Sequence, residues 1–303
     1  MSSQFWWVFD ALVILVAGYV LYSNIKRGMT KVMALSIGYI IAAFAASLIA
    51  AFGAQPVYES VAQNSNISAV ESVNEHVDLA GAFAKTINAQ DYGFQCTGRD
   101  IAAILRKQDY QQFDHALYEY TDEKSNGTVG DEGVFRILIK KSFIQAYGDA
   151  MNDKLPRYAR ASFEKQINES SDTMRKIVDA LYSSKSSSRE TAEEIERLFA
   201  QEATVEVLRI FIYVIVLSVL MVIAAVINAI LQNRLFFNLT NTKERFYGGV
   251  FGLLEVGVML VLLTLLIRLL VLLGGGKILF FSEEAIEKTF LFKHLYNNLS
   301  ALL

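Results

Sequence analysis

The sequence is poor in the residues that build disulfides and metal centres. Cys96 is the only cysteine among 303 residues, which excludes an intrachain disulfide and a thiolate metal cluster. The three histidines, His76, His115 and His294, are far apart and show no metal-ligand spacing. No phosphate-binding loop or nucleophile motif is present either. We therefore expect no metal, no cofactor and no enzymatic activity.

Charge is also scarce in four long stretches. The formal net charge is −3 and no dense Lys/Arg tract is present, so a nucleic acid is not an expected partner. Four apolar runs are each about as long as a helix needs to cross roughly 30 Å of hydrocarbon. They are Phe5–Ser23, Val32–Phe52, Leu208–Leu231 and Gly248–Leu273. Buried helices of a soluble protein are the alternative, and four runs of this length favour membrane spans.

The first run has a second alternative, a secretory signal peptide. Residues 1–4 carry no Lys or Arg, and a second apolar run follows almost at once. Both observations favour an uncleaved first span. The sequence thus predicts an all-α polytopic membrane protein with four transmembrane helices and a helical extracytoplasmic domain.

The predicted organisation has four parts. Residues 1–53 and 205–273 form two membrane halves with two spans each, and residues 274–303 form an amphipathic interfacial tail. Residues 54–204 form a helical insertion with 24 acidic and 17 basic residues. Packing of the tail onto the insertion is the alternative to its lying on the membrane. From Arg189 to Gln232 the chain has no Gly or Pro, which predicts one continuous helix that enters the third span.

Two short basic loops predict the orientation of the chain. Lys and Arg accumulate in the cytoplasmic loops of membrane proteins. The loop between the first two spans and the loop between the last two spans each carry three cations, and an even number of spans separates the loops. These cytoplasmic anchors are Lys26, Arg27, Lys31, Arg234, Lys243 and Arg245. Both termini and residues 54–204 are then extracytoplasmic.

Several stretches of the insertion read as amphipathic helices. In residues 131–151 the spacing predicts an inward face. That face contains Val134, Ile137, Leu138, Lys141, Ile144 and Gln145. Residues 160–184 read as a second helix, with Phe163, Ile167, Met174, Ile177, Val178 and Leu181 inside. Residues 98–120 read as a third, with Asp100 as its N-cap.

Polar residues inside the spans are candidates for function because they are costly in lipid. Asp10 and Arg268 lie at the same predicted depth near the outer end, so we expect them either to form an ion pair or to reach the interface separately. Glu255 lies deeper, with Asn228 at a similar level. Glu255 is interpreted as a site in a transport path or as a hydrogen-bonded structural acid, with the structural role preferred.

The fourth span opens with four glycines in ten residues: Gly248, Gly249, Gly252 and Gly257. Such residues let a second helix approach closely in lipid. Gly18, Gly38 and residues 42–47 offer matching small surfaces. In the tail, Ser282 is the expected N-cap of one helix with Ile286, Phe290, Leu291 and Leu295 on its apolar side.

These features together resemble the colicin V production protein (CvpA) family of bacterial inner-membrane proteins. The similar elements are Asp10, the "KRG" of residues 26–28, the "ERFYGGVFG" of residues 244–252 and the "AIEKTFLFKHLY" of the tail. Glu244 stands where the family usually has Asp, and Glu255 where many members carry a basic residue. The insertion is much longer than the central loop of that family.

The resemblance implies a role in toxin production, secretion or cell-envelope homeostasis, in the bacterial cytoplasmic membrane. We expect a non-enzymatic membrane scaffold whose partners are the lipid bilayer and a membrane or envelope protein or a second copy of the chain. The alternatives are a small transporter or channel that uses Glu255 and the glycine-rich fourth span, or an extracytoplasmic sensor.

Overall fold

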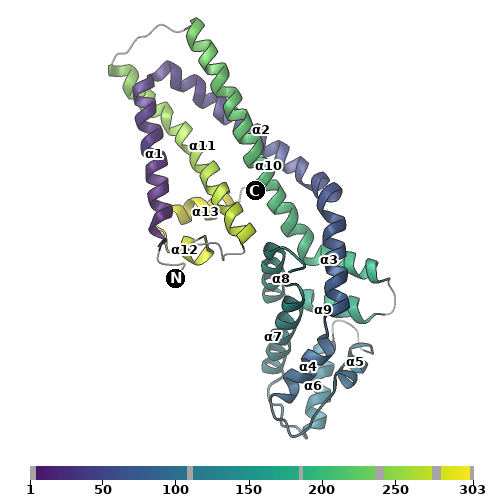
Figure 1. Ribbon diagram of the computed structural model, residues 1–303. Coiled ribbons are helices and arrows are strands. Elements are labelled where there is room, and N and C mark those ends of the chain that lie inside the picture. The colour runs from purple at the N-terminus through teal and green to yellow at the C-terminus, as the bar shows by residue number, and fades with distance from the viewer. Residues whose placement is uncertain (1–4, 108–111, 184–186, 236–241, 275–280, 301–303) are drawn as a thin grey trace. The chain divides into compact units, whose positions relative to one another are not determined.

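The computed structural model describes residues 5–107, 112–183, 187–235, 242–274 and 281–300; the side chains of 233–235 and 300 lie outside this description. Every element in these ranges is helical, which confirms the all-α prediction (Figure 1). The chain divides into two compact units. Unit 1 comprises residues 1–58 and 205–303, and unit 2 comprises residues 59–204. The predicted division lay at residues 53/54 and 204/205.

Unit 1 contains the four predicted spans, and all four are helices. They are α1 (Trp7–Arg27), α2 (Met29–Val57), α10 (Ser188–Leu235, of which residues from 205 belong to this unit) and α11 (Thr242–Gly274). Each is long and apolar enough to cross a membrane. Many of their large apolar side chains are exposed, among them Phe44 and Phe52 on α2 and Val222 on α10. Such a surface suits contact with lipid rather than water.

The continuous helix expected from Arg189 to Gln232 is confirmed, because α10 runs unbroken over 48 residues. At the other junction of the units, α2 contains Pro56 and leads into a short π-helix, η2 (Tyr58–Ala62). Proline has no backbone N–H and therefore disturbs the regular ladder of a helix near its position. This irregular turn coincides with the end of unit 1 at Tyr58.

A single residue joins α1 to α2. Gly28 has a φ of 84°, which other residues adopt only with strain, and its N–H donates to the carbonyl of Asn24. Figure 1 shows α11 beside α1, and α11 also packs against α2. A core of α2, α10 and α11 side chains, including Ala46, Leu217 and Leu265, fills the interior of this bundle.

The tail forms two short helices in place of the single helix expected. Ser282 caps α12 (Glu283–Glu287) through a bond from the N–H of Ala285, which confirms the predicted cap. The chain then turns before α13 (Phe292–Ser300), so Phe290 and Leu291 are exposed rather than part of an apolar stripe. Both helices pack against α1 and α11 in one apolar cluster within unit 1.

Unit 2 consists of α3 (Gln63–His76), α4 (Leu79–Asn88), α5 (Gly98–Leu105), α6 (Phe113–Lys124), α7 (Glu132–Ala150), α8 (Arg157–Glu169), α9 (Ser171–Tyr182) and residues 188–204 of α10. One apolar core joins all of these elements. Within this core the rings of Phe143, Tyr147 and Phe199 each pack against the ring of Phe163. Cys96 is buried in the same core.

Three local predictions for unit 2 were wrong. The buried face of α7 carries Phe135, Ile139, Phe143 and Tyr147, so the predicted face, with Val134 and Ile137, is the outer one. The stretch expected as one helix over residues 160–184 contains parts of two, α8 and α9, because Ser170 adopts extended backbone and caps α9. The stretch 98–120 also contains two helices, α5 and α6.

The cap of α5 is Thr97, not Asp100. The Thr97 side chain accepts the N–H of Asp100, and the Asp100 carboxylate accepts the N–H of Thr97 at 2.8 Å, which forms a capping box. These bonds to the ionised form hold the pKa of Asp100 below its usual value. Asp100 therefore takes part in capping α5, as the third residue of the capping box and not as the N-cap itself.

Candidate functional site

Most of the predicted polar and charged site residues of unit 1 lie towards the two ends of its helices. At one end, Gly28 and Thr30 lie against Glu244 at the start of α11, with 3.5 Å between the Thr30 hydroxyl and a Glu244 oxygen. Asn228 of α10 donates to the carbonyl of Lys31 at 3.4 Å. The loop between α1 and α2 is therefore close to the end of α10 and the start of α11, and the two basic loops share one end of unit 1.

The predicted anchors gather at this end. Lys26, Arg27, Lys243 and Arg245 are exposed, and Lys31 is half-buried. The Lys26 ammonium lies 4.2 Å from the centre of the Tyr22 ring. The side chain of Arg234 lies outside the described residues.

Glu255 is buried in α11 close to this end. Its carboxylate accepts a hydrogen bond of 2.8 Å from Nδ2 of Asn24 in α1. Asn24 is fully buried and Glu255 is 5% exposed. Asn228, which the sequence places at a level similar to that of Glu255, bonds to the backbone of α2. Asn24 could have been noted as a polar residue near the end of the first span, but nothing local to it points to α11.

Two of the four predicted packing glycines lie directly against Asn24. A Cβ on Gly252 would be 2.8 Å from Cβ of Asn24, and a Cβ on Gly248 would be 2.8 Å from its carbonyl oxygen. Gly249 approaches Ile25, whereas Gly257 has no neighbour within 4 Å of its would-be Cβ. The close approach of α11 to α1 is thus what brings Glu255 within reach of Asn24.

The surface of α1 that contacts the glycines of α11 is at its C-terminal end, around Asn24. It is not at Gly18, whose would-be Cβ has no neighbour within 4 Å. Gly38 faces a different helix, because its would-be Cβ lies 3.2 Å from Cβ of Ala224 in α10. Ala42 and Ala46, within the small stretch predicted to pack, are buried in the core of α2, α10 and α11.

At the opposite end of unit 1, the expected ion pair between Asp10 and Arg268 is replaced by two other interactions. The Asp10 carboxylate accepts the backbone N–H groups of Phe290, Leu291 and Phe292, at 2.8, 3.0 and 2.9 Å. These donors stand at the start of α13, where free N–H groups and the helix dipole favour an anion. Asp10 therefore ties the tail to α1.

Arg268 of α11 forms its ion pair with Glu206 of α10. Its guanidinium also lies 5.9 Å from the centre of the Tyr296 ring in α13. Burial raises the pKa of the Tyr296 phenol to about 12. Glu206 was not among the predicted site residues; it lies two residues before the third apolar run, Leu208–Leu231.

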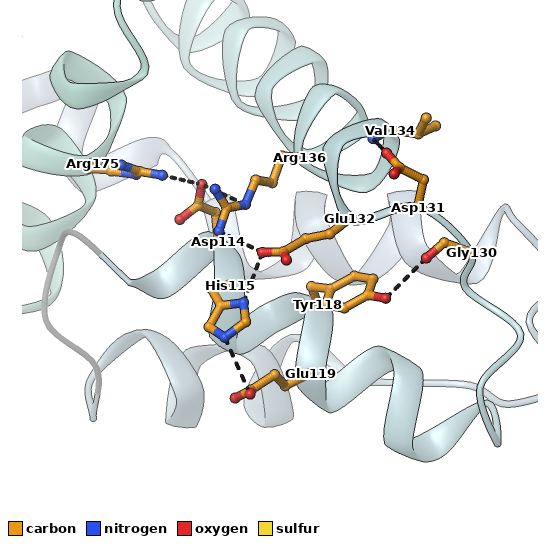
Figure 2. A network of polar contacts seen from close by, with 10 residues as sticks. All are labelled: Asp114, His115, Tyr118, Glu119, Gly130, Asp131, Glu132, Val134, Arg136 and Arg175. Atoms are coloured by element: carbon orange, nitrogen blue, oxygen red, sulfur yellow. Dashed lines mark hydrogen bonds and ion pairs between the residues drawn. The ribbon is translucent and has the colours of Figure 1, made fainter.

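Unit 2 has a polar network of its own, whose residues were not predicted from the sequence (Figure 2). Asp114 of α6 is almost fully buried and accepts a bond of 2.8 Å from Arg175 of α9. Nε of Arg136 in α7 lies 3.6 Å from the same carboxylate oxygen. One buried acid therefore links three helices, and each arginine remains 23% to 40% exposed at its side chain.

The network continues to the surface through His115. Its Nδ1 lies 2.8 Å from Glu132 and its Nε2 lies 3.3 Å from Glu119. The hydrogen bond with His115, followed by the charge of Arg136, lowers the pKa of Glu132. Among the described residues, no three His, Cys, Asp or Glu side chains are placed to hold a metal ion. The arrangement joins α6, α7 and α9.

No family model, curated protein or solved structure matches this chain. The site must therefore be interpreted from its own contacts. In both units, the buried polar side chains described above link different helices.

Proposed function

We propose that this chain is a non-enzymatic scaffold of the CvpA type in a bacterial cytoplasmic membrane. The four apolar helices cross the bilayer, the two basic loops face the cytoplasm, and unit 2 and both termini are extracytoplasmic. The protein assists toxin production and secretion or cell-envelope homeostasis by presenting unit 2 to a membrane or envelope protein.

One observation carries the proposal: the most deeply placed acid of the spans is used for packing. Glu255 bonds to Asn24 at the point where Gly248 and Gly252 bring α11 against α1. A carboxylate in a transport path needs access to water and to the transported ion, and Glu255 is 5% exposed. The contact instead holds two helices in one arrangement, as a scaffold requires.

The orientation rests on the shared position of the basic loops. Their cations lie at one end of unit 1, and the tail held by Asp10 lies at the other. The positive-inside rule then assigns the basic end to the cytoplasm. The acidic composition of residues 54–204, with a net charge of about −7 from 24 acidic and 17 basic residues, is compatible with the opposite side.

The substitution Glu255→Gln distinguishes the scaffold hypothesis from the transporter hypothesis. The Gln carbonyl still accepts the bond from Asn24, whereas the amide has no titratable proton and no charge. In a strain that lacks the chain, we expect the wild type and Glu255→Gln to restore toxin secretion and resistance to detergent equally. A proton flux in vesicles that the wild type supports and Glu255→Gln abolishes would establish the transporter instead.

A further inference from the structure

The surface of unit 1 has an apolar groove between α2 and α10. Its volume is about 270 Å³, just below the range of about 300–1,000 Å³ in which small-molecule sites fall. Gly38 allows the two helices to approach at its floor, because a side chain there would meet Ala224. The lining is small or aliphatic apart from one amide, and it includes Ala34, Gly38, Ala45, Ile223, Ile227 and Asn228.

The groove is open to the surroundings of the two helices. Ile41 and Ile227 on its walls are 63% and 51% exposed. Both helices are long and apolar enough to span a membrane, so hydrocarbon rather than water reaches an opening of this kind. The occupants to be considered are a lipid acyl chain and a helix of another protein molecule.

One end of the groove is polar. Asn228 is 8% exposed, and its Oδ1 has no hydrogen-bond partner among the described residues. Its Nδ2 donates to the carbonyl of Lys31. Lys31 precedes Ala34 by three residues and Gly38 by seven, a spacing that places all three on one face of α2. A cation therefore stands one turn beyond the apolar lining.

We propose that this groove binds an anionic phospholipid, with one acyl chain along α2 and α10 and the phosphate at Lys31. The inference rests on the proposed membrane location. Hydrocarbon in the groove and a cation at its end match the two parts of such a lipid, and basic positions at the edge of the membrane attract anionic headgroups. A second copy fits less well, because identically oriented copies would bring Lys31 and its basic neighbours to the same end.

Lipid counting on the purified, delipidated full-length chain tests the site. Native mass spectrometry would compare phosphatidylglycerol with phosphatidylcholine of equal chain length. We expect phosphatidylglycerol to bind more tightly. Lys31→Gln should lower its affinity about fivefold, the equivalent of one basic contact at about 1 kcal/mol. The affinity for phosphatidylcholine should fall less, because the choline of that lipid offsets the charge of its phosphate. Ala45→Phe, which fills the groove, should weaken both lipids.

Matched controls alter the same surface outside the groove. Lys26→Gln removes an exposed cation of α1 from the same end, and Val222→Phe enlarges an exposed side chain of α10 that does not line the groove. Both should bind lipid as the wild type does. Ala34→Phe fills the other end of the groove and serves as a second variant should Ala45→Phe lower the melting temperature.

The inference is overturned if the wild type binds the two lipids equally, or if Lys31→Gln and Lys26→Gln behave alike. It is also overturned if Ala45→Phe changes the oligomeric state and leaves the lipid count unchanged, since the groove would then hold a second copy. A separate measurement tests the proposed membrane location. Recovery of the chain in the soluble fraction without detergent would show that the protein is not in the membrane.

Discussion

The amide of Asn24 donates a 2.8 Å hydrogen bond to the carboxylate of Glu255 across 231 residues of sequence. Both side chains are at least 95% buried. Because lipid offers no alternative partner to a polar group, each side chain depends on the other. The bond therefore helps to fix how α11 packs against α1. Gly248 and Gly252 beside it allow the two helices to approach closely enough for the bond to form.

The glycine contact gives the first prediction. Gly252→Ala places a methyl group 2.8 Å from Cβ of Asn24 and forces α11 away from α1. We expect a loss of about 1–3 kcal/mol in stability, as for other overpacked interiors, measured by thermal denaturation of the purified chain. Gly257→Ala is the matched control, since its new methyl group meets nothing within 4 Å. Equal melting temperatures for the two variants would contradict the close approach.

The hydrogen bond itself can be tested with a double-mutant cycle. Glu255→Leu leaves Nδ2 of Asn24 without an acceptor, which should cost about 1–3 kcal/mol. Asn24→Leu should cost a similar amount. The double variant should be more stable than the sum of the two losses implies, because neither polar group remains unpaired. Strictly additive losses would show that the two side chains do not interact.

The tail should depend on Asp10. Asp10→Ala removes the acceptor of three N–H groups at the start of α13, and we expect its docking to weaken by about 2 kcal/mol. Hydrogen exchange should then accelerate at the amides of α13, while those of α2 keep their protection. Glu284→Ala, which removes an exposed pair with Lys288 on α12, is the control. Unchanged exchange in Asp10→Ala would refute the role of Asp10.

Some of this could be predicted from the sequence and some could not. The four spans were predictable because an apolar run of about twenty residues is typical of a membrane-spanning helix. The N-cap Ser282 was predictable because a cap bonds to backbone groups within the first turn of its own helix. The partner of Asp10 could not be predicted, because it is a set of backbone N–H groups about 280 residues away. Every residue except proline has such a group, so the sequence does not single these out. On α7 both faces carry apolar residues, and spacing alone could not show that the face with Phe135, Phe143 and Tyr147 is the buried one.

In unit 2, Asp114 should be the most sensitive charged residue. Asp114→Ala leaves Arg136 and Arg175 without their shared buried acceptor. Removing one member of such an ion pair typically costs about 3 kcal/mol or more. Thermal denaturation followed by circular dichroism would measure the loss, with Glu193→Ala, which breaks only an exposed pair with Arg197, as the control. Similar melting temperatures in the two variants would argue against a structural role for the network.

The same network predicts a loss of stability in acid. The bond with His115 and the charge of Arg136 keep the pKa of Glu132 below its usual 4.5. A lowered pKa contributes stability that is present above the unfolded value and is lost as the pH falls through the folded value. Between pH 7 and pH 3 the melting temperature should therefore fall more in the wild type than in Glu132→Gln. Parallel pH profiles would show that Glu132 does not contribute.

The side of the membrane on which unit 2 lies tests the central claim most directly. Cys96 is 4% exposed, so single cysteines at exposed positions, Glu169→Cys in unit 2 and Thr242→Cys at the basic end, should be placed on a Cys96→Ser background. In intact cells, an impermeant maleimide should label Glu169→Cys at once and Thr242→Cys only after lysis. Labelling of Thr242→Cys alone in intact cells, or protection of both positions, would contradict the proposed topology.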